Sequence, residues 1–322
     1  MLLNSLRSQF RQLKATRDAY GEALVELGKE NKDIVVLDAD TSSSTRTKLF
    51  AKTFPERFFN VGIAEQNLIG ISAGLARCGK IPFASSFSVF VPGKCVDQIR
   101  NAVAYPRLNV KIVATHSGLA TGADGAMHQA IEDIAITRAI PNMMVVVPAD
   151  AVETKKAIRA IVRYVGPVYV RLCRQSTPIV YGEDCSYALG KGVTLTDGDD
   201  AGVIACGVMV TEALLAAERL RDKGIFVKVI DMHTVKPIDG ELIVKTAKEA
   251  GAIVTAEDHN VIGGLGGAIS EILTEKYPVL MGRVGVNDVF GESGETDELM
   301  VRYGLTADNI VQKVKDLMIR KR

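Results

Sequence analysis

The sequence predicts an α/β protein with two domains, each with a mostly parallel sheet flanked by helices. Short, mostly apolar runs alternate along the chain with segments of helical periodicity, which is typical of strands covered on both faces. A turn-rich stretch over 175–190 interrupts this alternation, which then resumes. A chain of 322 residues, 47% of them hydrophobic, is long enough to build two cores.

The first domain is expected over residues 1–178. The segment 151–165 places Ile158, Ile161, Val162 and Val165 on one stripe, which indicates an amphipathic helix. Right-handed crossovers in a parallel sheet bring the loops that follow the strands to one edge. The expected strands are DIVVLD (33–38), FFNVG (58–62), KIPFAS (80–85), VKIVAT (110–115), MMVVVP (143–148) and PVYVRL (167–172).

A linker is expected over 179–190, and a second, smaller α/β domain over 191–322. The run EDHNVIGGLGGAISE (257–271) lacks the spacing of a dinucleotide-binding fingerprint, so its glycines indicate a turn or close helix packing. His233 and His259 are expected to be structural. The expected strands are AGVIACG (201–207), FVKVID (226–231), AIVTAE (252–257) and LMGRVGV (280–286), with helices near 209–223, 239–249, 264–276 and 307–319.

Composition narrows the functional class. A formal net charge of +1 with no basic block before the last few residues argues against a nucleic-acid partner. No apolar stretch is long enough to span a bilayer, so no membrane partner is expected. The N-terminal run 1–14 lacks the features of a signal peptide. Five scattered cysteines without CxxC spacing indicate neither a disulfide framework nor a zinc site, and favour a reduced, cytoplasmic location.

Chemically useful side chains follow several of the expected strands. Such residues meet in one cleft if the strand ends converge. They are Asp38 and Asp40 after the first strand, Glu65 after the second, Phe87 and Phe90 after the third, His116 to His128 after the fourth, and Arg174 after the last.

These segments together resemble a known family. The runs GIAEQNL, SSFSVF, THSGLATGADGAMHQ, IPNM and LCRQ are similar to the pyrimidine-binding domain of thiamine diphosphate enzymes, above all of transketolases. The region 190–322 resembles the C-terminal domain of the same proteins. The resemblance covers nearly the whole chain and implies thiamine diphosphate with Mg²⁺ as cofactors.

The resemblance implies the role of Glu65, which a helix dipole alone could otherwise explain. The glutamate of this motif contacts the aminopyrimidine ring and shares a proton with a ring nitrogen, so that the cofactor can deprotonate its own thiazolium carbon. Such a carboxyl needs a dry pocket, and Val61, Ile63 and Leu68 are compatible with one. By the same resemblance Phe87 and Phe90 hold the pyrimidine ring, and Asp40 lies close to the cofactor.

The resemblance also implies a substrate end. Asp124 and His128 match residues that meet the sugar hydroxyls and the reacting carbons, and His128 could shuttle protons because a histidine titrates near neutrality. Arg17, Ser44, His116 and Arg174 match positions that hold the sugar phosphate or its neighbouring hydroxyls. Arginine suits this task because its planar fork matches phosphate oxygens.

Departures from the family pattern leave alternatives open. The AEQN motif has alanine where many transketolases have arginine before the glutamate, and AEQ and GADG also occur in deoxyxylulose-phosphate synthases. His116 and the ITRAIPNM run favour transketolase. Half of a deoxyxylulose-phosphate synthase, a 2-oxo acid dehydrogenase beta chain and a non-catalytic assembly subunit remain as alternatives.

The diphosphate-binding part of the family pattern is not found in the sequence. The family uses a GDG motif followed by an asparagine, and the run TDGDDAG near 197 lacks that partner asparagine. We therefore expect a split enzyme in which an N-terminal subunit holds the diphosphate and Mg²⁺, with no metal ligand in this chain. Two copies of each subunit would form a heterotetramer that acts on sugar phosphates. A piece of a longer protein is the less economical interpretation.

Overall fold

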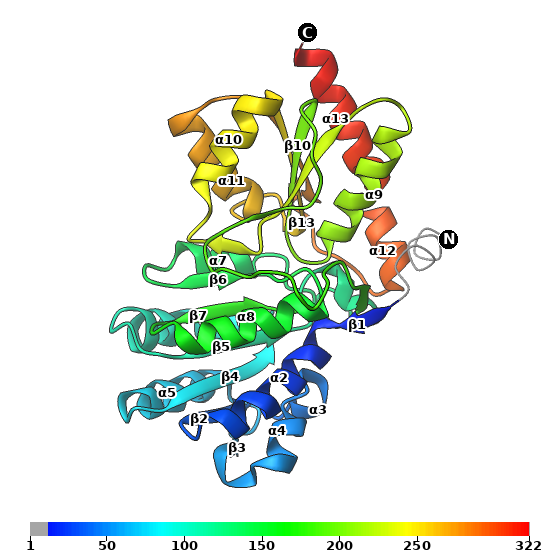
Figure 1. Ribbon diagram of the computed structural model, residues 1–322. Helices are drawn as coiled ribbons and strands as arrows, with labels where there is room; N and C mark the ends of the chain where they lie inside the picture. The colour runs from blue at the N-terminus through cyan, green and yellow to red at the C-terminus, as the bar shows by residue number, and fades with distance from the viewer. Residues whose placement is uncertain (1–11, 322) are drawn as a thin grey trace.

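The computed structural model describes residues 12–321 and shows two halves, each built around one sheet (Figure 1). The run 1–14, predicted to lack the features of a signal peptide, lies outside the described residues as far as residue 11, as do the outer limits of the two predicted domains. A small antiparallel pair, β1 (Leu13–Ala15) with β8 (Ser176–Pro178), accompanies the two main sheets.

The first sheet has seven strands in the order β12-β6-β7-β5-β4-β2-β3, and β12 alone runs antiparallel to its neighbour. Helices α2 and α8 cover one face, and α5 and α6 cover the other. The strands are β2 (Ile34–Asp38), β3 (Phe58–Asn60), β4 (Ile81–Phe87), β5 (Lys111–Thr115), β6 (Met144–Val146), β7 (Val168–Arg171) and β12 (Thr234–Lys236). The helices are α2 (Thr16–Glu30), α3 (Ser42–Thr45), α4 (Lys48–Thr53), η1 (Pro55–Arg57), α5 (Glu65–Arg77), α6 (Val91–Gln98), η2 (Ile99–Ala104), η3 (Leu119–Asp124), α7 (Asp133–Ala139) and α8 (Ala151–Arg163).

The second sheet has five strands in the order β14-β13-β10-β11-β9, parallel except for β9. Helices α9 and α13 cover one face, and α10 and α11 cover the other (Figure 1). The strands are β9 (Val193–Thr194), β10 (Ala201–Ala205), β11 (Val227–Asp231), β13 (Ala252–Asn260) and β14 (Leu280–Val286). The helices are α9 (Met209–Arg221), α10 (Gly240–Ala250), α11 (Leu265–Lys276), α12 (Thr296–Arg302) and α13 (Ala307–Lys321).

The structure confirms the predicted fold class, and each predicted strand and helix is present within a few residues of its predicted ends. The predicted helix 151–165 is shorter than expected, since it ends at Arg163. Val165 therefore lies beyond the helix, and it is 79% exposed. The glycines after β13 pack closely, as expected: side chains on Gly264 or Gly266 would overlap Glu257, His259 or Thr255. His233 and His259 are fully buried.

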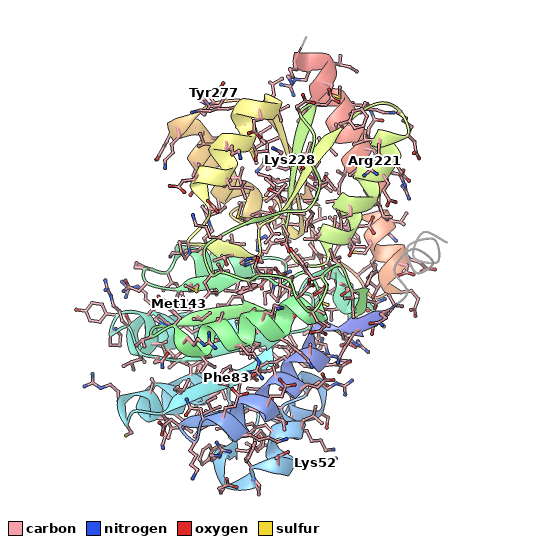
Figure 2. The ribbon with its side chains drawn as sticks, viewed as in Figure 1. Lys52, Phe83, Met143, Arg221, Lys228 and Tyr277 are labelled. Carbon is pink, nitrogen blue, oxygen red and sulfur yellow. The ribbon has the colours of Figure 1, made fainter. Side chains whose placement is uncertain are left out.

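Alternation along the strands builds a core on each face of the first sheet. Ile34 and Val36 of β2 point toward α2 and α8, whereas Val35 and Leu37 point toward α5 and α6. Phe83 of β4 belongs to the first of these layers and is fully buried (Figure 2). Sheets covered on both faces need apolar residues at successive positions, which explains the continuous apolar runs in the sequence.

The two halves are joined more closely than a linker alone would allow. The strand β12 follows the second half's β11 yet completes the edge of the first sheet beside β6. One apolar cluster continues from the first sheet to Ile204, Met232 and Ile243 of the second half. The sequence did not predict that β12 joins the first sheet. The domain boundaries 1–178, 179–190 and 191–322 stay a prediction.

No helix within residues 12–321 is both long and apolar enough to cross a membrane.

Replacing Phe83 by alanine should destabilise the chain by about 3–5 kcal/mol, because the substitution leaves a cavity in a packed core. Urea-induced unfolding followed by circular dichroism measures the change. Phe226→Ala is the matched control, since Phe226 is 50% exposed and its loss should cost about 0.5 kcal/mol. Equal losses for the two variants would contradict the assignment of this core.

Candidate active site

The predicted side chains gather at the carboxyl ends of adjacent parallel strands. Phe87 ends β4, His116 follows β5, and Arg174 lies three residues beyond β7, while β4, β5 and β7 are neighbours in the sheet. A hollow of about 340 Å³ opens there. It is lined by Arg17, Ser43, Ser44, Arg46, Phe87, His116, Asp124 and Arg174. The hollow thus brings together most of the predicted residues and adds Ser43 and Arg46, which were not predicted from the sequence.

Positive charge dominates one end of this hollow. Arg17 donates from Nη1 to the carbonyl oxygen of Ser44 at 3.0 Å, and Arg174 forms an ion pair with Asp124 at 3.0 Å. Burial, together with the nearby Arg46 and Arg174, lowers the pKa of Arg17. Arg46 and Arg174 are paired with Asp18 and Asp124, whereas Arg17 contacts the neutral Ser44 carbonyl and His116, so its positive charge favours an anionic ligand.

His116 connects this positive end to the aromatic side chains. Its ring stacks on Phe87 with 3.9 Å between centroids. Its Nε2 lies 3.3 Å from Nη1 of Arg17, and its Nδ1 lies 2.8 Å from Oγ1 of Thr115. Because arginine can only donate, Nε2 accepts and Nδ1 carries the proton. Burial and the two arginines lower the pKa of His116 to about 3, so the imidazole is neutral at physiological pH.

The aromatic part of the site consists of Phe87, Phe90 and His128. The rings of Phe87 and Phe90 lie nearly parallel, 5.7 Å apart. His128 meets both edge-on, 6.1 Å from Phe87 and 5.5 Å from Phe90. The buried Nδ1 of His128 has no hydrogen-bond partner among the described residues. An unpaired ring nitrogen beside two phenylalanines is suited to a polar ligand that brings its own hydrogen-bonding group.

Glu65 is the first residue of α5 and is only 6% exposed. Both of its carboxylate oxygens lie 3.2–3.3 Å from Nζ of Lys94, which sits 4.4 Å from the ring centroid of Phe90. Lys94 was not predicted from the sequence. Lys94 lies four residues after Phe90 at the start of α6, and side chains four residues apart on a helix are neighbours. This spacing is the sequence signal that could have indicated Lys94.

The expected dry pocket around Glu65 is only partly built by this chain. Leu68 is fully buried, as predicted, but Ile63 is 81% exposed, so the prediction that Ile63 shields the carboxylate is wrong for the chain by itself. The buried face of α5 carries Leu68 and Ile69, whereas Ile71 is partly exposed. The backbone turns outward at Gly62, which has a φ of 73°.

Asp40 lies apart from the hollow, two residues beyond β2, where its carboxylate accepts a hydrogen bond from Nδ2 of Asn60 at 2.8 Å. Asp40, Arg46 and His116 all have positive φ, at 64°, 69° and 60°. Side chains other than glycine rarely adopt this backbone conformation, and such strain often collects at functional sites. Three strained residues near one edge of the sheet therefore support a binding site there.

The aromatic side chains, Glu65 and the unpaired His128 nitrogen form a chemical set that fits a flat, hydrogen-bonding ring such as an aminopyrimidine. Within residues 12–321, no group of three or more His, Cys, Asp or Glu residues is arranged to hold a metal ion. The fit of these side chains concerns the pyrimidine end of thiamine diphosphate.

Comparison with known proteins agrees with this geometry. The sequence matches the family model of the transketolase pyrimidine-binding domain over residues 12–180. The chain belongs to the transketolase family. A second match, to the transketolase C-terminal domain, covers residues 190–310. This family is a class of thiamine-dependent transferases that generally uses thiamine diphosphate and a divalent metal ion.

Several relatives are of similar length to this transketolase-family chain. A transketolase C-terminal section of Methanocaldococcus jannaschii is 54% identical, over 95% of this chain and 96% of its own length. A 6-deoxy-6-sulfo-D-fructose transketolase subunit of Clostridium sp. is 44% identical, over 95% of each chain. One of the subunits of an apulose-4-phosphate transketolase of Phocaeicola vulgatus is 41% identical, over 92% of this chain and 95% of its own length.

A solved structure supports the same assignment. It is described as a split gene transketolase in an inactive beta4 tetramer. It is 54% identical, covers 96% of this chain and 99% of its own, and superimposes with a TM-score of 0.90. The chain thus corresponds to the C-terminal section of split transketolases.

The lowered pKa of His116 predicts that its imidazole does not titrate between pH 5 and 8. An unfolded histidine binds a proton below about pH 6.5. The folded state does so only near pH 3, so His116 costs stability as the pH falls from about 6.5 toward 3. Histidine NMR signals recorded against pH, with the signal assigned by its loss in His116→Gln, test this. A midpoint near 6.5 would contradict the buried, arginine-flanked environment.

Proposed function

We propose that this chain is the C-terminal subunit of a split transketolase that transfers a two-carbon ketol unit from a ketose phosphate to an aldose phosphate. The observation that carries the proposal is the continuous contact path from Glu65 through Lys94 and Phe90 to Phe87, and from Phe87 through His116 to Arg17. One end of the path suits a cofactor ring and the other an anion. A ketol transferase for charged sugars needs both.

At the cofactor end, bound thiamine diphosphate would supply the nucleophilic carbon that accepts and stabilises the ketol unit. Glu65 would share a proton with a pyrimidine nitrogen of the bound cofactor. Phe87 and Phe90 would hold the ring, and Asp40 would be a further cofactor contact. Burial of Glu65 behind Leu68 excludes water from one side, and the open side near Ile63 is left to a partner.

At the substrate end, each side chain has a separate task. His128 moves protons to and from the sugar oxygens next to the reacting carbons, and Asp124 binds neighbouring hydroxyls. Arg17, Arg174 and Ser44 bind the phosphate. His116 stays neutral and, through Nε2, accepts a hydrogen bond, which keeps Arg17 oriented toward the anion.

The anionic group need not be a phosphate. One similar protein is named for a sulfo-sugar and another for a sugar phosphate. Sulfonate and phosphate oxygens both match the arginine fork. The phosphate is favoured here because a dianion is the better partner for Arg17, Arg46 and Arg174 in one hollow.

The proposal includes an N-terminal partner subunit that holds the diphosphate and Mg²⁺, in a heterotetramer with two copies of each chain. The outer face of α5 supports a protein neighbour, since Ile63 and Ile71 are exposed and side chains on Gly70 or Gly74 would meet nothing within 4 Å. The beta4 tetramer of the similar split transketolase is described as inactive, which fits a need for a partner. A cytoplasmic location remains a prediction from the cysteines.

The first experiment is ketol transfer from xylulose 5-phosphate to ribose 5-phosphate. The chain is assayed alone and in the complex that it captures from its native extract, with thiamine diphosphate and magnesium. Activity in the complex alone supports the proposal. Pyruvate-dependent release of carbon dioxide would instead favour a deoxyxylulose-phosphate synthase half or a 2-oxo acid dehydrogenase beta chain.

Replacing Glu65 by alanine should lower turnover of the reconstituted complex by about 10²–10⁴-fold, the range for positioned proton-transfer groups. Steady-state ketol transfer measures it. Glu241→Ala is the control, since Glu241 lies on α10 with a side chain 91% exposed. Full activity of both variants would favour a non-catalytic assembly subunit.

Replacing Arg17 by methionine should raise KM for the phosphorylated ketose about tenfold or more, because a charge-assisted hydrogen bond is lost. The KM for the same ketose without its phosphate should change little. Comparison of the two donors in the reconstituted complex isolates the anion contact. Equal changes for both donors would place Arg17 outside the anion site.

A further inference from the structure

The loop over 117–129 carries Asp124 and His128 and contacts the second half of the chain at several positions. Its three glycines, Gly118, Gly122 and Gly125, have φ values of 68°, 77° and 77°. A side chain at Gly118 would overlap the carboxylate of Asp258. One at Gly122 would approach Thr296 within 2.9 Å, and one at Gly125 would overlap Ser293. Each positive-φ glycine of the loop therefore faces a segment of the second half.

Asp258 makes the most direct of these contacts. It lies in β13, is 3% exposed, and accepts hydrogen bonds from the backbone N–H of Leu119 at 2.9 Å and of Ala120 at 3.2 Å. These are the first two residues of η3, whose last residue is Asp124. A buried carboxylate that receives two backbone N–H groups restrains that turn, since a shift of the turn would leave a buried carboxylate and two donors without partners.

A second segment, 291–296, supports the loop from its other side. The Nε2 of Gln129 donates both to the carbonyl of Gly122 at 3.1 Å and to that of Glu292 at 3.0 Å. Oγ1 of Thr296 donates to the carbonyl of Ala120 at 3.3 Å. The loop is thus held at its start by Asp258 and along its length by 291–296.

The loop in turn holds the substrate side chains. Arg174 donates from Nη1 to the carbonyl oxygen of Thr121 at 3.2 Å and pairs with Asp124 at 3.0 Å. A shift of the η3 turn would therefore move Asp124 and change the position of Arg174 in the hollow.

We propose that Asp258 is a positioning residue for the substrate end of the site, acting from the second half of the chain through the η3 turn on Asp124 and Arg174. The second half then contributes to substrate binding. The link to substrate binding rests on the proposed ketol transfer, whereas the ordering of the loop by Asp258 does not.

The test compares Asp258→Asn with Asp239→Asn. Asp239 is a matched control because it too is a buried carboxylate of the second half that accepts two backbone N–H groups, from Leu242 and Gly192, both at 3.2 Å. It caps α10, outside the loop. Asparagine keeps the size of aspartate but presents an N–H₂ group to one of the two donors. Thr296→Val is a milder second variant in case Asp258→Asn does not fold.

Hydrogen–deuterium exchange on the isolated chain gives the first readout. Asp258→Asn should speed exchange of the amides in 117–129 while the sheet strands keep their protection, and Thr296→Val should do so to a smaller extent. Asp239→Asn should leave the loop unchanged. Unchanged loop exchange in both Asp258→Asn and Thr296→Val would overturn the proposal, as would an equal loop effect from Asp239→Asn.

Kinetics of the reconstituted complex give the second readout. Asp258→Asn should raise KM for the phosphorylated ketose about tenfold with kcat within about threefold, because Asp258 holds the start of the loop at Leu119 and Ala120, whereas His128 lies at its other end beside Gln129, which Glu292 holds. The KM for the phosphate-free ketose should rise less, and Asp239→Asn should leave both KM values unchanged. A fall in kcat alone would overturn the proposed route through Asp124 and Arg174. If the wild-type complex has no ketol transfer, the proposed function fails, and loop exchange still decides the role of Asp258.

Discussion

The buried ion pair between Arg171 and Asp133 is the interaction on which the arrangement of the site depends. Nε of Arg171, in β7, lies 2.8 Å from the carboxylate of Asp133 at the start of α7, and both side chains are almost fully buried. Nη2 of Arg171 also donates to the carbonyls of Ala130 and Asp258. The guanidinium of Arg171 therefore links β7, α7, the residue that follows the 117–129 loop, and the second half of the chain. Removing either partner would leave a buried charge unpaired, so this junction has little freedom to change.

Electrostatics and backbone strain act together at the carboxyl edge of the first sheet. The arginines of the hollow repel one another, and His116 is kept neutral between them. Asp40, Arg46 and His116 have left-handed backbone conformations that the packed sheet must stabilise. In the proposed function, a bound anion would offset the repulsion that Arg17 experiences from Arg46 and Arg174.

The proposed cofactor end differs from the arginine-lined hollow, because this chain covers Glu65 on only one side. Glu65 is buried by its own helix, yet Ile63 and the small residues of α5 face outward. A carboxylate that must hold a proton works best where water is excluded from every side. In the proposed function, this open side would tie activity to association with the partner subunit. In the chain by itself, Lys94 pairs with Glu65.

The sequence alone determined the fold class and predicted most of the residues that line the hollow. Local periodicity is written in consecutive residues, and GIAEQNL and THSGLATGADGAMHQ keep their chemistry in contiguous runs. Only the tertiary structure decided which distant groups meet them. Lys94 reaches Glu65, β12 crosses to the first sheet, Asp258 holds the 117–129 loop, and Ile63 turns to the outside. These contacts depend on how whole elements pack across the two halves, and a local pattern of residue types does not record which distant element a given face packs against.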